Sequence, residues 1–270
     1  MGNTKRPRLV IIKLGGSVVT YKDSSISKTR VDVIKNLAKE IKKIVDQSKY
    51  KIILVHGAGY VHQMVKKNNI YKGMRNEKQK LAFLLAQDEM LKLNSLIMYH
   101  LLGAKLQAVS LPPHTFITQS SGKLKYFDLS IIKKYLDCGQ IPVLFADMVL
   151  DNKWGCSVLS GDTTTVYLAK KLKADKLIFL SDVDGIYEQD PKKNPKAKLI
   201  PEITNSNLNQ ILKGLTLNNP NDVSGEMKGK VLQIKQNLAS VDVLITNGLK
   251  PGLLLKGLGQ SPIGTKLLLH

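Results

Sequence analysis

The sequence contains little cysteine and no long apolar run. Its 270 residues include two cysteines, Cys138 and Cys156, which lack metal-ligand spacing and are too few for a disulfide framework. A reducing cytoplasm is therefore the expected setting. No stretch of about 18 or more apolar residues occurs, so we expect no transmembrane helix. The basic segment from Met1 to Arg8 leads into an apolar run at 9–12 that is too short for a signal-peptide core.

Arginine is also scarce, although the chain is strongly basic. The formal net charge of +20, from 41 basic and 21 acidic residues, would ordinarily suggest a nucleic-acid partner. However, the basic residues are nearly all lysines scattered along the chain, and arginine is the residue that reads phosphate and guanine with two hydrogen bonds. The pattern argues against a nucleic-acid partner and leaves open a weak attraction to anionic substrates or polyanions.

Strand-like and helical patterns alternate along the chain. With 43% hydrophobic and 23% charged residues, the composition supports a large core and excludes wholesale disorder. Strands followed by helices of ten or more residues indicate βαβ units. We therefore predict an α/β fold, a three-layer αβα sandwich with a mostly parallel central sheet, as a single domain over 1–270. Strands are expected at 9–14, 51–56, 106–111, 141–147, 176–181 and 241–245, and helices at 30–47, 80–102, 129–136, 163–173 and 226–239.

The end of the first predicted strand carries a basic, glycine-rich segment. Lys13 lies within the strand, and Gly15, Gly16 and Ser17 follow it, with Lys22 nearby. Ligands of an open parallel sheet bind beyond the carboxyl ends of its strands, and glycines let the backbone approach an anion closely. A phosphate site is one interpretation of this segment, and a simple tight turn is the other.

The second predicted strand also ends in glycines. Gly57, Ala58 and Gly59 lead to His62, a side chain that can bind a phosphate. The segment does not match the Walker pattern, because no Gly-Lys-Ser/Thr follows, and it lacks the third glycine of a dinucleotide fingerprint. A structural role for His62 remains the alternative.

Three further segments carry acidic or basic side chains at predicted element ends. Asp162 follows Ser160 and Gly161 at a helix start, where it can cap the helix or orient cationic groups. Asp182 and Asp184 follow a strand and can hold a ribose or hydrated Mg²⁺, or simply build a turn. The segment 222–230 opens the last long helix, and lysines at a helix start favour an anionic partner there.

The order of these segments resembles the amino acid kinase superfamily along nearly the whole chain. Within it, the sequence is most similar to the isopentenyl phosphate kinases. The histidine at position 62 is typical of isopentenyl phosphate and fosfomycin kinases, and is not expected in UMP, aspartate or acetylglutamate kinases. The closer similarity rests on 13–17 with Lys22, 55–59 with His62, 160–162, 182–187 with 190–191, 222–225 and 264–265.

The resemblance implies ATP and Mg²⁺ as cofactors and isopentenyl phosphate as the acceptor, in an alternative mevalonate route. It further implies a homodimer, with the acceptor on the N-terminal part and the nucleotide on the C-terminal part. The catalytic residues would be Lys13, Lys22, His62, Asp162 and Lys230. The residues that bind ATP would be Lys13, Gly15, Gly16, Ser17, Gly59, Asp182, Asp184, Gly185, Tyr187, Gly225, Glu226 and Lys230. His62, Ala58 and Gly161 would bind the acceptor phosphate.

Two other functions stay open. One is a related small-molecule kinase, such as a fosfomycin-type phosphonate kinase. The other is a catalytically weak, basic binding protein that keeps the fold. Three features favour it: the acidic Glu226 beside Gly225, a shortened segment before His62, and the net charge. The predicted helix at 80–102 could wall a pocket for a short prenyl tail or simply belong to the core, with apolar positions at Leu81, Leu84, Leu85, Met90, Leu93, Ile97 and Leu101.

Overall fold

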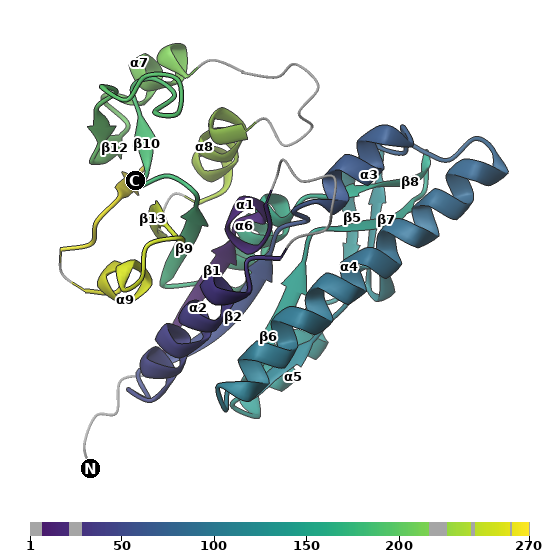
Figure 1. Cartoon of the computed structure of the whole chain (residues 1–270), viewed down its shortest axis with the longest axis horizontal. Helices are drawn as coiled ribbons and strands as arrows, with labels where there is room; N and C mark the ends of the chain where they lie inside the picture. Colours follow the sequence, from purple (N-terminus) through teal and green to yellow (C-terminus); the bar gives the residue numbers. More distant parts are fainter. Residues whose placement is uncertain (1–6, 22–28, 216–225, 239–240, 260, 270) are drawn as a thin grey trace.

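The central feature of the computed structural model is an eight-stranded sheet (Figure 1). The structure describes residues 7–21, 29–215, 226–238, 241–259 and 261–269. Neighbouring strands follow the order β12-β14-β13-β9-β1-β2-β6-β3 and are parallel except at the β13–β14 pair. The strands span Arg8–Leu14 (β1), Tyr50–His56 (β2), Ala108–Ser110 (β3), Ile141–Phe145 (β6), Lys176–Ser181 (β9), Glu202–Thr204 (β12), Asp242–Asn247 (β13) and Thr265–Leu268 (β14).

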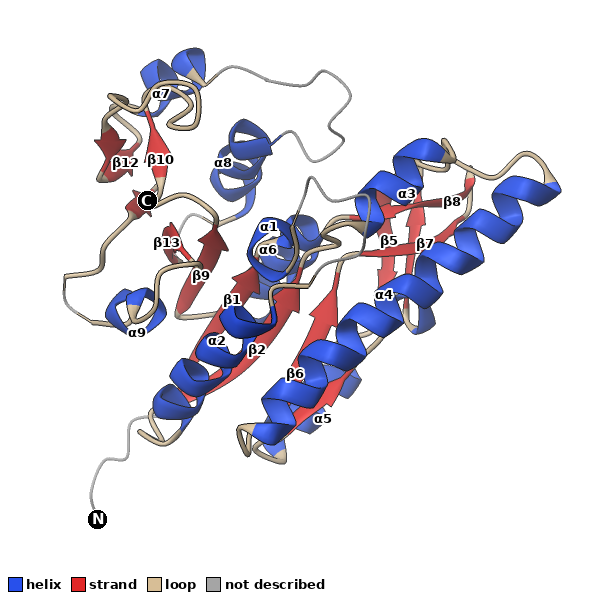
Figure 2. Cartoon of the chain, viewed as in Figure 1, coloured by secondary structure: helices blue, strands red, loops and turns tan. Residues whose placement is uncertain are grey.

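Helices cover both faces of this sheet, which confirms the predicted αβα layers (Figure 2). Side chains alternate between the two faces of β1, so that Val10, Ile12 and Leu14 belong to one core and Ile11 to the other. The first core includes residues of α1 (Gly16–Val19), α2 (Val31–Val45), α3 (Val61–Lys67), α4 (Glu77–Gly103) and α9 (Leu253–Gly257). The second includes residues of α5 (Ser130–Asp137), α6 (Gly161–Leu172), α7 (Leu208–Gly214) and α8 (Glu226–Asn237).

A second, four-stranded sheet lies beside α3 and the N-terminal half of α4 (Figure 1). Its strands follow the order β5-β4-β7-β8. The sequence patterns at 106–160 did not predict a separate sheet. The strands span Ile117–Ser120 (β4), Lys123–Phe127 (β5), Asp147–Asp151 (β7) and Gly155–Leu159 (β8). A short 3₁₀ turn, Pro113–Thr115, precedes β4, and a small pair is formed by β10 (Ile186–Tyr187) and β11 (Leu199–Ile200).

The buried face of α4 is the predicted one at Met90, Leu93, Ile97 and Leu101, and differs from it only in the N-terminal part of the helix. Leu81, Leu84 and Leu85 are exposed, and the smaller Ala82 and Ala86 are buried instead. α4 is 27 residues long and runs past both the main sheet and the second sheet (Figure 1), and the exposed leucines lie in its N-terminal half. None of the described helices combines the length and apolar character needed to cross a membrane.

Candidate active site

A cleft of about 750 Å³ opens at the carboxyl ends of β1, β2 and β9, with the start of α6 beside them. These strands are neighbours in the sheet, so their terminal loops meet, as expected for a parallel α/β protein. Most of the residues singled out in the sequence line this one cleft: Lys13, Gly15, Gly16, Ser17, Ala58, Gly59, His62, Gly161, Asp162, Asp182, Gly185, Tyr187 and Lys230.

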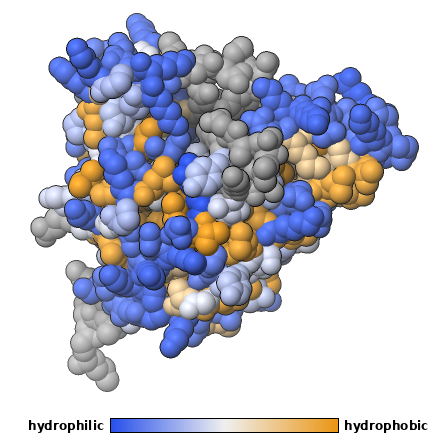
Figure 3. All heavy atoms as spheres, viewed as in Figure 1, coloured by the Kyte–Doolittle hydropathy of each residue, from blue (hydrophilic) through white to orange (hydrophobic). Residues whose placement is uncertain are grey.

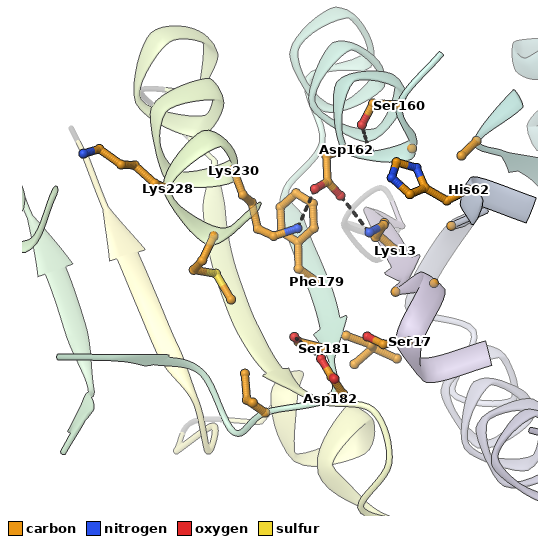
Figure 4. A pocket seen from close by; sticks show the side chains of 18 of the residues that line it. Lys13, Ser17, His62, Ser160, Asp162, Phe179, Ser181, Asp182, Lys228 and Lys230 are labelled. Carbon is orange, nitrogen blue, oxygen red and sulfur yellow. Dashed lines mark hydrogen bonds and ion pairs between the residues drawn. The ribbon is translucent and has the colours of Figure 1, made fainter. Parts of the chain in front are cut away.

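A buried carboxylate joins two lysines at the centre of the cleft (Figure 4). Asp162 Oδ1 lies 2.8 Å from Lys13 Nζ, and Asp162 Oδ2 lies 2.7 Å from Lys230 Nζ. Lys13 follows the alternation of β1 onto the face that α6 covers, and Asp162 lies in the first turn of α6. Lys230 extends from α8, and its Nζ lies 4.4 Å from the centre of the Phe179 ring, a cation–π contact.

The electrostatics keep Asp162 ionised and the cluster positive. Burial raises the pKa of this carboxyl, but the charges of Lys13 and Lys230 outweigh it and hold the pKa well below its ordinary value. Two lysines and one carboxylate leave a net positive charge that faces the cleft, which suits an anionic ligand. The helix cap is Ser160, whose side chain accepts a hydrogen bond from Asp162 N, so Asp162 is not the N-cap.

The two glycine loops touch each other under the cleft. A Cβ on Gly57 would lie 2.5 Å from Gly16 N, and a Cβ on Gly59 would lie 2.3 Å from Thr20 Oγ1. Gly59 also has a φ of +55°, a conformation that favours glycine. The glycines therefore let the loops after β1 and β2 pack together as a cradle of backbone groups.

His62 lies in the first turn of α3 and lines the cleft, although the segment before it is short. Figure 4 shows its ring on the same side of the cleft as Lys13. Its ring makes an edge contact with Tyr71, with the ring centres 5.8 Å apart. A second, small cavity of about 20 Å³ lies directly beside it and is lined mainly by apolar side chains: Ala58, Val61, His62, Val65, Met90, Ala146, Asp147, Met148 and Val158.

The two acidic residues after β9 have different partners and lie differently relative to the cleft. Asp182 lines the cleft and forms an ion pair with Lys192. Asp184 is not among the residues that line the cleft, because Lys250 and Asn247 hold its carboxylate at 2.7 and 2.9 Å. These partners turn the Asp184 carboxylate away from the cleft lining, and the predicted role of Asp184 in ATP binding stays a prediction.

Three predicted residues cannot be placed as side chains. Lys22 and Gly225 lie outside the described residues. Glu226 begins α8, and only its backbone is described. Their predicted roles stay predictions.

The sequence reasoning missed several residues of the cleft. Gln63 and Lys66 line it from α3, and Gln119 and Gly122 line it from the second sheet. Lys66 could have been found from its spacing, since it stands one helical turn after His62. Gln119 and Gly122 carry no such signal, because a sheet that was not predicted brings them to the cleft.

Comparison with known proteins shows the family of the chain. The amino acid kinase family model matches residues 8–247. The chain belongs to the amino acid kinase family. This family member is 34% identical to the isopentenyl phosphate kinase of Methanothermobacter thermautotrophicus over 96% of its own length and 98% of the relative's. It is also 34% identical to that of Methanocaldococcus jannaschii, over 96% and 98%.

Solved structures show the same family fold. An X-ray structure of isopentenyl phosphate kinase superposes with a TM-score of 0.82 at 32% identity, covering 96% of this chain and 99% of the other. UMP kinase from Ureaplasma parvum superposes with a TM-score of 0.67 at 19% identity, a likeness of fold alone.

The carboxylates of this amino acid kinase do not form a metal centre in the described part of the chain. Asp162 is engaged by two lysines and Asp182 by one. Mg²⁺ ordinarily takes one or two free carboxylates together with substrate phosphates. The described residues therefore do not preform a Mg²⁺ site, and a Mg²⁺ ion in the cleft would take most of its ligands from substrate phosphates and water.

Proposed function

We propose that this amino acid kinase transfers the γ-phosphoryl group of ATP to isopentenyl phosphate, giving isopentenyl diphosphate and ADP. The observation that carries the proposal is the junction of a positively charged cleft with an apolar cavity at His62. The 34% identity to isopentenyl phosphate kinases over 96% of the chain supports the same acceptor.

The junction suits a molecule that is anionic at one end and apolar at the other. Ala58, His62, Ala146 and Val158 line both cavities. A phosphate beside His62 would leave the hydrocarbon tail of the acceptor next to the apolar cavity. Its volume of about 20 Å³ holds little more than a water, so a five-carbon tail would have to widen it by moving side chains such as Met90. Of the predicted wall at 80–102, Met90 is the residue that lines this cavity.

The chemistry needs positioning and charge neutralisation rather than a general base. An oxygen of the acceptor phosphate attacks the γ-phosphorus of ATP, a new P–O bond forms, and the bond to the β-phosphate oxygen breaks to release ADP. The attacking oxygen is already anionic, so no proton has to be removed. Phosphoryl transfer is catalysed mainly by alignment and electrostatic stabilisation.

The lysines would supply that stabilisation. Lys13 would contact the transferring phosphoryl group, Lys230 would bridge the ATP phosphates, and Lys22 would add charge. Asp162 would hold Lys13 and Lys230 at fixed positions, which is supported by distances of 2.8 and 2.7 Å. His62, with the backbone of Ala58 and Gly161, would bind the acceptor phosphate.

The nucleotide would occupy the other end of the cleft. Gly15, Gly16, Ser17 and Gly59 would line its phosphates. Asp182, Gly185 and Tyr187 would contact the nucleoside, with Gly225 and Glu226 nearby. Mg²⁺ would arrive bound to the phosphates of ATP as part of the substrate, since the protein offers it no carboxylate cluster in the described residues. The reaction would serve an alternative mevalonate route in the cytoplasm.

An apolar stripe on α4 supports the proposed homodimer. Leu81, Leu84, Leu85, Leu91, Tyr99 and Leu102 are exposed at roughly helical spacing. Figure 3 shows an apolar area on the surface over the N-terminal half of this helix. The charged Asp88 and Lys92 share this face, so the apolar area is concentrated at Leu81, Leu84 and Leu85. Exposed apolar clusters often mark interaction surfaces, and a two-fold symmetric pair is the commonest way to cover one. We therefore propose a second copy of the chain as its occupant.

An acceptor panel tests the proposed activity. ADP release is measured with MgATP and isopentenyl phosphate, dimethylallyl phosphate, fosfomycin, UMP or acetylglutamate. We expect turnover on the two prenyl phosphates alone. Turnover on fosfomycin instead would assign a phosphonate kinase, and ATP binding without turnover on any acceptor would favour a binding protein.

A further inference from the structure

Asp151, at the end of β7, is a buried carboxylate that the proposed chemistry does not use. It is 3% exposed. Its Oδ1 accepts hydrogen bonds from the backbone N–H groups of Ser121, Lys153 and Trp154 at 2.9, 2.9 and 3.0 Å. Its Oδ2 accepts one from Gly122 N at 2.8 Å. One carboxylate therefore binds two separate turns of the second sheet.

Both turns contain left-handed backbone, and the β4–β5 turn needs this support because one of its left-handed residues is not a glycine. Ser121 and Gly122 have φ values of +51° and +73°, and Gly155 has +83°. A serine in the left-handed region is uncommon and costs free energy that its surroundings must supply. The two hydrogen bonds from Ser121 N and Gly122 N to Asp151 hold the β4–β5 turn in this conformation.

The carboxylate has to be ionised to do this. Burial raises its pKa, but hydrogen bonds from the backbone of Gly122, Trp154 and Lys153 outweigh burial and lower the pKa to about 2. Among the described residues, no lysine or arginine forms an ion pair with it. Backbone N–H groups thus stabilise Asp151 as an anion. An asparagine NH₂ group in place of one carboxylate oxygen would face backbone N–H donors and could not accept their hydrogen bonds.

The same network reaches the acceptor end of the cleft. Gln119 is 1% exposed, and its Nε2 donates to Gly122 O at 3.2 Å. The Ser157 hydroxyl lies 2.7 Å from Gln119 Oε1 and 2.8 Å from Asp151 Oδ2. Gln119 and Gly122 line the cleft, and Val158, next to Ser157, lines both the cleft and the apolar cavity beside His62.

The loop after α3 is fastened to the same turn. A Cβ on Gly73 would lie 2.5 Å from Trp154 O, and Lys72 pairs with Ser157 as an isolated bridge. The aromatic ring of Trp154 covers Gly122, where an added Cβ would come within 3.0 Å of the ring. The turn that Asp151 caps therefore contacts both the second sheet and the segment that follows His62 and Tyr71.

We propose that Asp151 is a positioning residue for the phosphate acceptor: through the β4–β5 turn and Ser157 it holds the wall formed by Gln119, Gly122 and Val158 opposite α3. This inference rests on the proposed function, because it assigns Asp151 to the acceptor half of that site. The nucleotide half, at Ser181 to Tyr187, contains none of these contacts. Loss of Asp151 should therefore weaken the acceptor and spare ATP.

The experiment compares Asp151→Asn with a matched control, Glu40→Gln. Glu40 is also a buried carboxylate held by backbone N–H groups, from Gly252 at 2.6 Å and Leu255 at 3.2 Å, and it fastens α2 to α9 away from the cleft. Steady-state KM values for isopentenyl phosphate and ATP, kcat and Tm are measured for both variants.

We expect both variants to lose several degrees in Tm, and only Asp151→Asn to raise the KM for isopentenyl phosphate, by about tenfold. Its KM for ATP should stay within about twofold of the wild type. An unchanged acceptor KM, or an equal rise for ATP and acceptor, would overturn the proposal.

A milder variant covers the case in which Asp151→Asn does not fold. Ser157→Ala removes one hydroxyl of the network and should raise the acceptor KM about threefold without changing that for ATP. No change would overturn the proposal. Wild-type protein without turnover on isopentenyl phosphate would instead refute the proposed function, so the two failures are distinguishable.

Discussion

Lys13 Nζ lies 2.8 Å from Asp162 Oδ1, where the end of β1 meets the first turn of α6. Both side chains are almost fully buried, so the pair is an organised part of the fold rather than a surface contact. Since Asp162 holds Lys230 with its other oxygen, a single carboxylate fixes the distance between two cations that would face the transferring phosphoryl group.

Replacing Asp162 by Asn should therefore reduce kcat by about 100-fold or more, because it leaves two buried lysines without their anion and misplaces both. Steady-state ADP release checks this. Asp242→Asn is the matched control, since Asp242 pairs with Lys176 at 2.8 Å at the opposite end of β9. Equal activity of the two variants would contradict the role of Asp162.

His62→Ala should reduce kcat/KM for isopentenyl phosphate by about 100-fold, because the acceptor phosphate loses its side-chain partner. The Kd for ATP, measured by calorimetry, should stay within about twofold of the wild type. Lys67→Ala, on the same helix but away from the cleft lining, serves as the control. An unchanged rate for His62→Ala would remove the assignment of the acceptor site.

Stability should depend on pH through His56. Burial lowers the pKa of His56 from 6.5 to about 4, so the folded protein takes up its proton later than the unfolded chain on acidification. The free energy of unfolding that the neutral His56 contributes is therefore fully present above pH 6.5 and is lost as the pH falls toward 4. The loss between pH 7 and pH 5 is about 2 kcal/mol. Urea unfolding at both pH values should show this extra loss in the wild type and not in His56→Gln. The same pH dependence in both proteins would contradict the pKa shift.

Leu84→Glu should convert the proposed dimer into a monomer, because it places a charge between Leu81 and Leu85, where the exposed leucines of α4 are most closely spaced. Light scattering after gel filtration measures the mass. Lys133→Glu makes the same change of charge on α5, which covers the other face of the main sheet, and should leave the dimer intact. A wild-type protein that elutes as a monomer would refute the dimer.

The sequence predicted the layers of the fold well because buried parallel strands and amphipathic helices have strong local patterns. The predicted strand at 51–56 is β2 almost residue for residue, and the predicted helix at 163–173 overlaps α6. The second sheet was not predicted, because its strands are short and the predicted strand at 141–147 in fact ends at Phe145, with β7 starting at Asp147. On α4 the periodicity predicted the buried positions Met90, Leu93, Ile97 and Leu101, but in the N-terminal part Ala82 and Ala86 are buried in place of the leucines.

The candidate site also contains residues that the sequence predicts and residues that it does not. Lys13, Asp162 and Lys230 could be named from motif order, and the structure brings them within ion-pair distance. The ion pair of Asp184 with Lys250 could not be predicted, because it depends on the position of β13 and cannot be read from the turn itself. Asp151 has no motif at all, since its importance comes from four backbone N–H groups that only the folded second sheet assembles.

Phosphorus NMR of a reaction containing the protein, MgATP and isopentenyl phosphate tests the central claim most directly. The proposed function predicts that the phosphomonoester signal disappears while the two coupled signals of a diphosphate monoester and an equal amount of ADP appear. A reaction that forms ADP and inorganic phosphate only, or that leaves isopentenyl phosphate unchanged, would contradict it.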